Sequence, residues 1–261
     1  MKIAILYICT GKYNQFFEGF YRSAMRYFMT NQDKTFFVWT DNDCIADGLP
    51  NVRVIHKECA GFPADSLFRF EMYLQAEEEL KKYDYIYFIQ ANALFLQPVG
   101  DELLPDESGL SMGIWGGKML KKPVCFYPYE RNKKSLAYVA PYGKNYVYYM
   151  GGINGGRSRE YLEMARTLAG NIRDDYKRGI IAKVHDQSHI NAYLRTHKCK
   201  IITPDYCWPE EWPTDIEPKM IFRDKYKYDE YFKRGRKTTI TARLKKGSLI
   251  IWSAIRWYLK F

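Results

Sequence analysis

Two side-chain amides, Gln90 and Asn92, close an apolar run over residues 85–95 that is typical of a buried strand. Residues two apart on an extended segment share a face, so both amides can contact one ligand. In open α/β sheets, ligands bind beyond the carboxyl ends of such strands. We therefore predict a ligand at residues 90–92. A polar cap of the strand end is the structural alternative.

Other residues could bind an anion or a metal. Arg69, Arg223, Lys225 and Lys227 suit a phosphate, because arginine binds phosphate bidentately and lysine supplies a mobile charge. An ordinary basic surface is the alternative for residues 223–227. The histidines of 185–189 are four apart, as in zinc-binding helices, but an Asp replaces the usual Glu and no third ligand is evident. The pattern gives little support for zinc.

Two glycine pairs interrupt an aromatic strand over residues 146–156. Glycine weakens a strand unless something must approach the backbone closely, and a ligand would explain it. The long basic and aromatic loop at 118–132 is either functional or simply solvated.

The predicted elements would bring these residues together. We expect strands at 3–10, 35–40, 52–56 and 200–203 and helices at 14–29, 66–83, 158–178 and 185–197, with Asp186 capping the last helix. Their alternation predicts an α/β fold with a mostly parallel central sheet.

Composition limits the partners and the compartment. The net charge of +10 suits an acidic ligand, a nucleic acid or an anionic membrane. Nucleic acid is the least favoured because no recognised binding motif occurs. The six cysteines form no C-x-x-C pair and are expected to be reduced, in a cytoplasmic protein. No signal peptide or apolar run of roughly 20 residues is evident, so we expect no membrane span.

Several motifs together resemble family 6 glycosyltransferases, which include the histo-blood-group A and B transferases and α-1,3-galactosyltransferase. The motifs lie in the family's order between about residues 3 and 227, at 37–41, 69–72, 129–131, 148–156 and 185–194. Their agreement in order and spacing makes the resemblance specific.

The resemblance implies a GT-A (Rossmann-like) nucleotide-sugar transferase domain over residues 1–232. It implies retaining transfer of galactose or N-acetylgalactosamine (GalNAc) from a UDP-sugar to the 3-position of a galactose. Animal members hold manganese with a D-x-D at the position of Gln90 and Asn92, whereas bacterial members with amides there need no metal. We therefore expect no cofactor or metal, although Gln90 stands where those members usually carry Asn.

Carried over by position, the resemblance assigns the donor and acceptor sites. The uridine pocket would be lined by Ile8, Thr10 and Tyr13, and the ribose, diphosphate or sugar would meet Arg69, Gln90, Ala91 and Asn92. Asp186 would bind the hydroxyls of the donor sugar, and Lys227, with Arg223 and Lys225 beside it, would close over the diphosphate. The donor pocket would be shaped by Met150, Gly151 and Gly152. The acceptor would meet Trp115, Pro128 and Gln187.

A glycine at position 152 leaves room for an acetamido group, so UDP-GalNAc is expected over UDP-galactose. Met150 instead matches the galactose-using enzymes. The family's A and B members require a fucosylated galactose, and the residues that would read fucose cannot be assigned from the sequence.

The main departure from the family is Gln187, which replaces the glutamate of its H-D-E-S-H motif. In the family that carboxylate lies below the reacting sugar carbon. An amide carries no charge, so we expect a weakened enzyme, natural or engineered. The alternative is an inactive carbohydrate-binding protein on the same fold.

The C-terminal tail, residues 233–261, combines a basic stretch with an apolar helix over 249–261 that is too short to span a membrane. Such a helix suits the surface of an anionic bilayer, here the inner face of a bacterial membrane. Packing of the helix on its own domain is the alternative.

Overall fold

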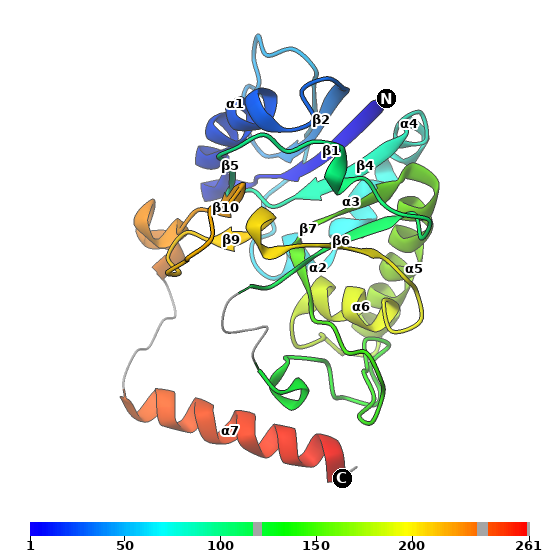
Figure 1. The fold of residues 1–261 in the computed structure, drawn as a ribbon, viewed down its shortest axis with the longest axis vertical. Helices are drawn as coiled ribbons and strands as arrows, with labels where there is room; N and C mark the ends of the chain where they lie inside the picture. Colours follow the sequence, from blue (N-terminus) through cyan, green and yellow to red (C-terminus); the bar gives the residue numbers. More distant parts are fainter. Residues whose placement is uncertain (117–121, 234–239, 260–261) are drawn as a thin grey trace.

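A computed structural model describes residues 1–116, 122–233 and 240–259. Within them, seven strands form a central sheet in the order β3-β2-β1-β4-β7-β6-β8 (Figure 1). Their bounds are β1 Lys2–Ile8, β2 Asp33–Thr40, β3 Val52–His56, β4 Tyr85–Ile89, β6 Leu110–Ile114, β7 Tyr149–Arg157 and β8 Lys200–Ile202. A smaller sheet contains β5 (Ala93–Phe95), β10 (Met220–Phe222) and β9 (Trp208–Pro209).

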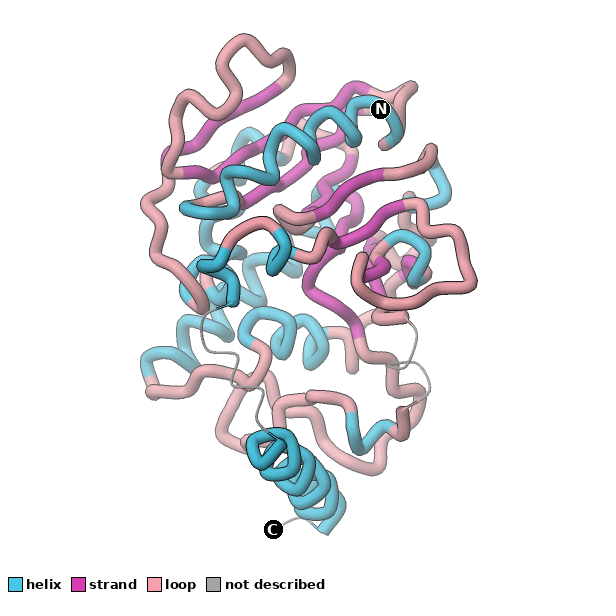
Figure 2. Tube along the Cα trace, turned by 90° about the vertical axis from the view of Figure 1, so that its left-hand side faces the viewer, coloured by secondary structure: helices cyan, strands magenta, loops and turns pink. Residues whose placement is uncertain are grey.

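The central sheet is covered on both faces because its strands are apolar on both faces. Ile3, Ile5 and Tyr7 of β1 pack in the core under α1 (Phe17–Tyr27). Ala4 and Leu6 pack in the opposite core, with α3 (Arg69–Gln75) and α5 (Ser158–Lys177). Figure 2 shows α1 on one side of the strands and other helices behind them. The result is a three-layer α/β domain.

The predicted mostly parallel sheet is confirmed. β1 pairs in parallel with β2 and β4, β2 with β3, and β6 with β8. Only the glycine-rich β7 runs antiparallel to its neighbours, β4 and β6. The carboxyl ends of β1 and β4 therefore lie side by side at one edge of the sheet.

The predicted helix at 66–83 is wrong in its continuity. The chain forms α2 (Ala64–Leu67), α3 and α4 (Glu77–Leu80), which are separated at Phe68 and Ala76. At both residues ψ is near +15°, and i→i−3 hydrogen bonds such as Glu71 N to Phe68 O replace the helical ones. Apolar spacing identifies the buried side of a segment, but it does not report such local breaks.

Other boundaries also differ from the prediction. The helix expected at 14–29 begins as a 3₁₀ turn, η1 (Gly11–Phe16), before α1. The apolar run at 85–95 is two strands, because the chain leaves the central sheet after Ile89 and enters the smaller sheet at Ala93. The helix expected from 185 to 197 is α6 (His185–Tyr193). Part of the loop predicted at 118–132 lies outside the described residues, and the rest contains η4 (Val124–Phe126).

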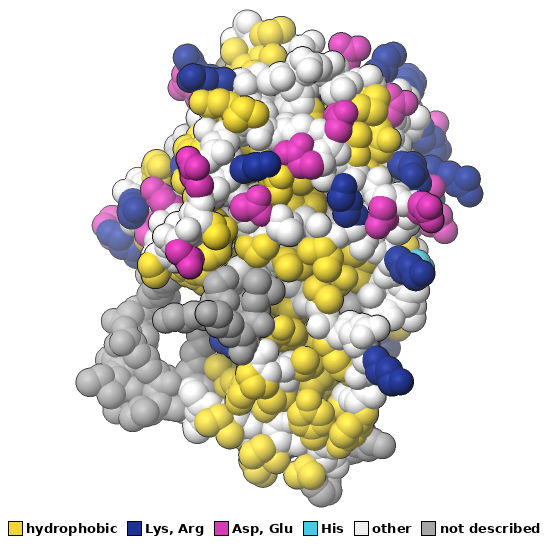
Figure 3. Space-filling view, in the orientation of Figure 1, with side chains coloured by type: hydrophobic (Ala, Val, Ile, Leu, Met, Phe, Trp, Pro, Cys, Tyr) yellow, Lys and Arg dark blue, Asp and Glu magenta, His cyan; other side chains and the backbone are white. Residues whose placement is uncertain are grey.

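The C-terminal helix α7 (Ile240–Leu259) starts earlier than predicted and packs on its own domain along one face. Trp257 is buried against Tyr129 and Tyr146, and its Nε1 donates to Val139 O (2.9 Å). Figure 3 shows hydrophobic side chains gathered at the end of the molecule where α7 lies. None of the helices within the described ranges is both long and apolar enough to cross a bilayer.

Candidate active site

A cavity of about 760 Å³ opens where the carboxyl ends of β1 and β4 meet. This volume lies within the usual range for small-molecule sites. Its walls come from four separate segments of the chain. They are Ile8, Thr10, Gly11, Lys12 and Tyr13; Cys59, Gly61, Phe62, Asp65, Ser66 and Arg69; Phe88, Gln90 and Ala91; and Lys225, Tyr226, Tyr231 and Phe232.

The described lining is basic and aromatic. Lys12, Arg69 and Lys225 contribute three cations to the lining against one lining carboxylate, Asp65, and Lys12 also pairs with Asp229 (3.3 Å), which is not part of the lining. That carboxylate is engaged by the protein, since Thr10 Oγ1 (3.0 Å) and Gly61 N (2.9 Å) donate to it. The excess of positive charge favours an anionic ligand.

The turn after β1 is held by a carboxylate at the end of β2. Asp41 accepts hydrogen bonds from Gly11 N (3.0 Å) and from Asn14 Nδ2 (2.8 Å). Burial raises the pKa of Asp41, but these hydrogen bonds outweigh burial and keep the pKa below its usual value. Gly11 has φ +56°, a conformation that favours glycine. The turn brings Thr10 and Tyr13 into the cavity wall.

The strand end at 90–92 is at the cavity, but its residues face different ways. Gln90 and Ala91 line the cavity, and Gln90 N donates to Gly152 O (2.8 Å). Asn92 instead turns its side chain away, and its Nδ2 donates to Arg223 O (2.7 Å) in a buried contact. The expectation that both amides share one face fails because the strand ends at Ile89 and the period of two ends with it.

Of the three C-terminal cations, the structure places only Lys225 at the cavity. Its Nζ donates to Tyr13 Oη (2.9 Å). Arg223 is buried behind the wall, where it donates to Phe16 O (2.9 Å) and to the backbone oxygens of Asn92 and Ala93. Lys227 pairs with Glu210 (3.6 Å). Arg223 is therefore engaged by the backbone and Lys227 lies outside the lining, and the predicted contacts of both with a diphosphate stay predictions.

Arg69 links the cavity to the start of α6. Its Nη1 donates to Gly151 O (2.9 Å), and its Nε lies 3.1 Å from Asp186 Oδ2. The Nε–H itself donates to Ser66 O (3.2 Å), so the contact with Asp186 is electrostatic rather than an aligned hydrogen bond. Asp186 does not cap α6 as predicted, because its side chain points toward Arg69 and no side-chain cap bond is present.

Burial raises the pKa of the Asp186 carboxyl to about 6, although the charge of Arg69 acts to lower it. Among the described residues, Asp186 Oδ2 accepts no hydrogen bond. It lies 3.2 Å from where a Cβ would sit on Gly151. A buried acceptor that lacks a donor is available to a ligand hydroxyl.

The Gln187 amide is held at both ends. Its Oε1 accepts from Gly151 N (2.7 Å), and its Nε2 donates to Tyr148 Oη (2.7 Å). Asn191 Nδ2 donates to Gln187 O (2.8 Å) from the next turn of α6. A glutamate carboxylate could accept from both Gly151 and Tyr148, so the position accommodates either side chain.

Gly152 is explained by packing. A Cβ at this position would lie 2.8 Å from Phe222 Cζ and 3.0 Å from Gln90 Oε1. The space that the glycine was predicted to leave for an acetamido group is therefore filled by protein. Met150 is buried in the core beneath α1. Gly151 O accepts from Arg69 and Gly152 O accepts from Gln90, and both of these partners line the cavity.

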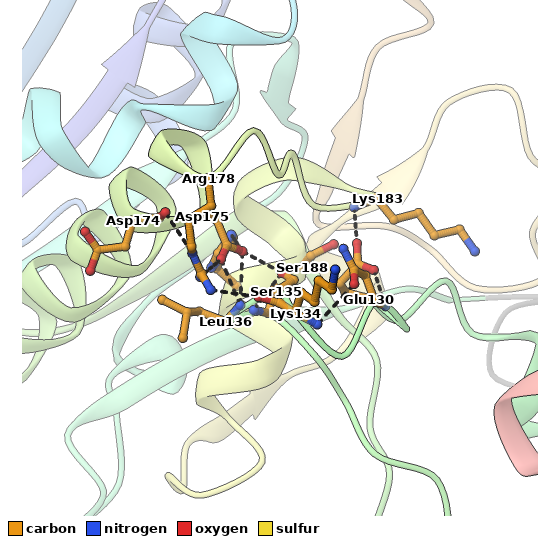
Figure 4. A network of polar contacts seen from close by, with 12 residues as sticks. Glu130, Lys134, Ser135, Leu136, Asp174, Asp175, Arg178, Lys183 and Ser188 are labelled. Atoms are coloured by element: carbon orange, nitrogen blue, oxygen red, sulfur yellow. Dashed lines mark hydrogen bonds and ion pairs between the residues drawn. The ribbon is translucent and has the colours of Figure 1, made fainter. Parts of the chain in front are cut away.

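Two buried carboxylates tie α5 and α6 to the loop at 130–138 (Figure 4). Glu130 accepts from Lys183 N (2.6 Å), just before α6. Asp175 of α5 accepts from Ser135 Oγ (2.5 Å) and Leu136 N (3.0 Å). This network fixes the approach of the chain to His185 and so places Asp186 and Gln187 beside Arg69.

The His185–His189 pair does not form a metal site. The His185 ring packs at a tilt against Phe62 (4.8 Å between ring centroids), whereas His189 is buried 3.7 Å from Asp175. Burial lowers the pKa of His189 to about 4, against the effect of Asp175, so it is neutral. In the parts of the chain that the structure describes, no three His, Cys, Asp or Glu residues form a group that could hold a metal ion.

The residues predicted for the acceptor, Trp115 and Pro128, are not part of the cavity lining. Trp115 packs against the aromatic cluster around Tyr148, and its ring lies 6.0 Å from Trp212. Pro128 follows Tyr127, whose ring is 5.7 Å from that of Tyr148. Both are thus near the residue that holds the Gln187 amide.

Sequence reasoning missed several wall residues, namely Lys12, Phe62, Asp65, Phe88, Tyr226, Tyr231 and Phe232. Lys12 and Tyr226 neighbour predicted residues in sequence and could have been included. No spacing signal connects Phe62 with Phe232, because the fold alone brings them together.

Comparison with known proteins identifies the family that the sequence matches. A family model described as glycosyltransferase family 6 matches residues 1–231. The chain is 33% identical over 232 residues to the O-antigen biosynthesis glycosyltransferase WbnI of Escherichia coli, covering 88% of this chain and 98% of that protein. It is 27% identical over 232 residues to the globoside alpha-1,3-N-acetylgalactosaminyltransferase 1 of Homo sapiens, covering 85% of this chain.

The histo-blood group ABO system transferase 2 of Rattus norvegicus is 27% identical over 225 residues, or 81% of this chain. The match spans 65% of the human protein and 66% of the rat protein, so this chain covers just under two thirds of these animal relatives. The resemblance seen in the sequence and the GT-A-like α/β fold are both confirmed. The chain belongs to glycosyltransferase family 6.

Proposed function

We propose that the chain transfers GalNAc from UDP-GalNAc to the 3-hydroxyl of a terminal galactose, with retention of the α configuration and without a metal ion. The observation that carries the proposal is the continuity of two sites. A cationic, aromatic cavity ends at Arg69, and Arg69 contacts both Gly151 and Asp186 beside Gln187. A nucleotide in the cavity would present its sugar to these residues.

The cavity can neutralise a diphosphate with protein cations. Lys12, Arg69 and Lys225 come from three segments of the chain, and all three line the cavity. The donor set at 90–92 does not fit a divalent cation, because such ions prefer carboxylate ligands and the Asn92 amide faces Arg223 O. We therefore assign the charge of the diphosphate to Lys12, Arg69 and Lys225.

Asp186 would orient the donor sugar. Its buried Oδ2 lacks a donor among the described residues, and a sugar hydroxyl could supply one. The preference for GalNAc over galactose rests on the family resemblance at residues 150–152, and not on open space beside Gly152, and on the names of relatives such as the globoside N-acetylgalactosaminyltransferases. Phe222 occupies the space beside Gly152, so an acetamido group would have to lie along another wall or displace that ring.

Gln187 would face the reacting carbon as a neutral dipole. It can neither act as a carboxylate nucleophile nor place a negative charge near a developing oxocarbenium ion. We propose that the chain is a slow transferase for this reason. The second candidate is a UDP-sugar-binding or carbohydrate-binding protein without turnover. The neutral amide of Gln187 favours this candidate as well.

We place the chain in the cytoplasm and expect a fucosylated galactose as acceptor. The unpaired state of all six cysteines supports a reducing compartment. Product analysis with UDP-GalNAc and UDP-galactose, on fucosylated and plain lactose, tests the proposal. Transfer from UDP-GalNAc to the galactose 3-hydroxyl supports it. Equal or better use of UDP-galactose would refute the donor preference, and nucleotide binding without product would favour the second candidate.

A further inference from the structure

The helix α7 presents a row of large apolar side chains to solvent. Ile251, Trp252, Ile255 and Leu259 recur at intervals of three and four residues and are 44–59% exposed. This spacing places them on one face of the helix. On the opposite face, Ala254 and Trp257 are buried on the domain, and Ile250, one turn before Ala254, is 41% exposed. An exposed apolar row on a helix that is already docked marks a contact surface.

The inward face holds α7 firmly. Besides the bond from Trp257 to Val139 O, Arg131 Nη1 donates to Ser253 Oγ (2.7 Å) and its guanidinium lies 5.1 Å from the Trp257 ring. The same contacts fix the rotation of the helix. Ile251 and Ile255 therefore cannot turn inward without breaking them.

The charge of the sequence segment that contains this row indicates its partner. Residues 234–261 carry eight of the 40 Lys and Arg residues of the chain and none of its 30 Asp and Glu residues. They hold eight of the ten net positive charges, and the rest of the chain is close to neutral. An apolar row within such a basic segment matches an anionic lipid surface, which accepts apolar side chains and attracts Lys and Arg.

A second copy of this chain is a poorer occupant of the same face. Two α7 faces in contact would bring two segments of charge +8 together, and like charges oppose association. A bilayer with anionic headgroups removes this conflict.

We propose that the face of α7 formed by Ile251, Trp252, Ile255 and Leu259 binds the surface of an anionic bilayer. The helix lies in the plane of the interface with this row in the lipid. Trp257 and Arg131 keep the domain attached on the other side. Binding in this mode needs no membrane span and does not depend on catalytic activity.

Co-sedimentation of the full chain with vesicles tests the proposal. Vesicles of phosphatidylcholine alone are compared with vesicles containing about one third phosphatidylglycerol. We expect binding to the anionic vesicles, weaker binding as salt rises, and little binding to the neutral ones. Removal of one positive charge should weaken vesicle binding about fivefold, so Lys245→Gln with Lys246→Gln, which removes two charges, should weaken it about 25-fold.

The matched variants are two pairs of isoleucines with similar exposure. Ile251→Ser with Ile255→Ser removes residues that are 54% and 44% exposed on α7. Ile181→Ser with Ile216→Ser removes residues that are 50% and 42% exposed elsewhere on the surface. We expect the first pair to lower vesicle binding at least about tenfold and the second to leave it unchanged. Circular dichroism confirms folding of both.

Equal loss in both pairs, or equal binding to neutral and anionic vesicles, would overturn the proposal. Sedimentation velocity without lipid tests whether a second copy of this chain covers the face instead. A dimer that Ile251→Ser with Ile255→Ser dissociates, in a chain that does not bind vesicles, would assign the face to a second copy.

Discussion

Arg69 and Asp186 lie 3.1 Å apart, and both are buried where the cavity meets the start of α6. The pair joins two functions in one place. Arg69 contributes charge to the cavity wall, and it compensates a carboxylate that has no hydrogen-bond donor on Oδ2 within the described chain. Several measurable consequences follow from this contact.

Replacing Arg69 with Met should destabilise the protein, because the Asp186 carboxylate would then be buried without a compensating charge. We expect a loss of about 3–5 kcal/mol in the free energy of unfolding at neutral pH. The companion variant, Arg69→Met with Asp186→Asn, removes the charge and should recover part of this loss. Urea unfolding of the three proteins measures the effect. A double variant no more stable than Arg69→Met would contradict the assignment.

Donor use should depend on pH through Asp186. Burial raises the pKa of this carboxyl from 3.8 to about 6. As the pH falls through 6 the carboxylate is protonated and accepts fewer hydrogen bonds, so kcat/KM for the donor should decline. The profile is measured between about pH 5 and pH 8, with Asp186→Asn as control, in which the decline near pH 6 should vanish. An unchanged profile shape in that variant would assign the titration to another group.

The same pKa has an opposite effect on stability. A folded-state pKa above the unfolded value means that the native state binds more protons between pH 3.8 and about 6. The contribution of Asp186 to stability is therefore fully present below pH 3.8 and is lost as the pH rises through this window. Unfolding of Asp186→Asn should show a weaker dependence on pH over the same range.

Much of the architecture could be predicted from the sequence because apolar periodicity reports burial. The bounds of β3 agree, and the mostly parallel sheet follows from the alternation of strands and helices. The helix breaks at Phe68 and Ala76 could not be predicted from apolar periodicity. The segment buries the same side before and after each break, so its apolar pattern is that of one continuous helix. Tertiary packing determines where such helices break.

The site was predictable where a residue follows a strand within one or two positions, as Gln90 and Thr10 do. The site was not predictable where a side chain could bond either to a ligand or to another part of the protein. Asn92 and Arg223 bond to each other across 131 positions and turn from the cavity, although both stand in the motif positions of ligand-binding residues. Position in a motif does not determine the direction of a side chain.

Lys225 and Lys227 provide a direct test of the structure against the motif. Lys225 lines the cavity, whereas Lys227 pairs with Glu210 outside it. We expect Lys225→Ala to weaken UDP binding about tenfold or more, the value of a charge-assisted hydrogen bond. Lys227→Ala serves as the matched control and should change the affinity by less than about twofold. Calorimetric titration with UDP measures both affinities. The reverse order would favour the motif assignment over the observed positions.

Gln187→Glu should raise the rate of transfer about 100-fold or more, because a carboxylate would face the reacting carbon. Gly151 N and Tyr148 Oη, which hold the amide, can both donate to it. Single-turnover assays of the two proteins measure the change. UDP affinity, which should be equal in both, controls for altered binding. If transfer does not rise, Gln187 is not the residue that faces the reacting carbon.

In the Gln187→Glu background, Tyr148→Phe should lower the rate and leave UDP affinity unchanged, because it removes one of the two groups that orient the carboxylate. We expect a loss of about tenfold, the value of one hydrogen bond to a charged group. A change confined to KM for the donor would show that Tyr148 acts on binding instead.

The central claim is that protein cations, and not a metal ion, hold the diphosphate while GalNAc is transferred. Transfer from UDP-GalNAc to fucosylated lactose in excess EDTA, with the product linkage determined by NMR, tests it most directly. We predict an α-1,3-linked product formed at the same rate with and without EDTA. Loss of transfer in EDTA that added Mn²⁺ restores would contradict the claim.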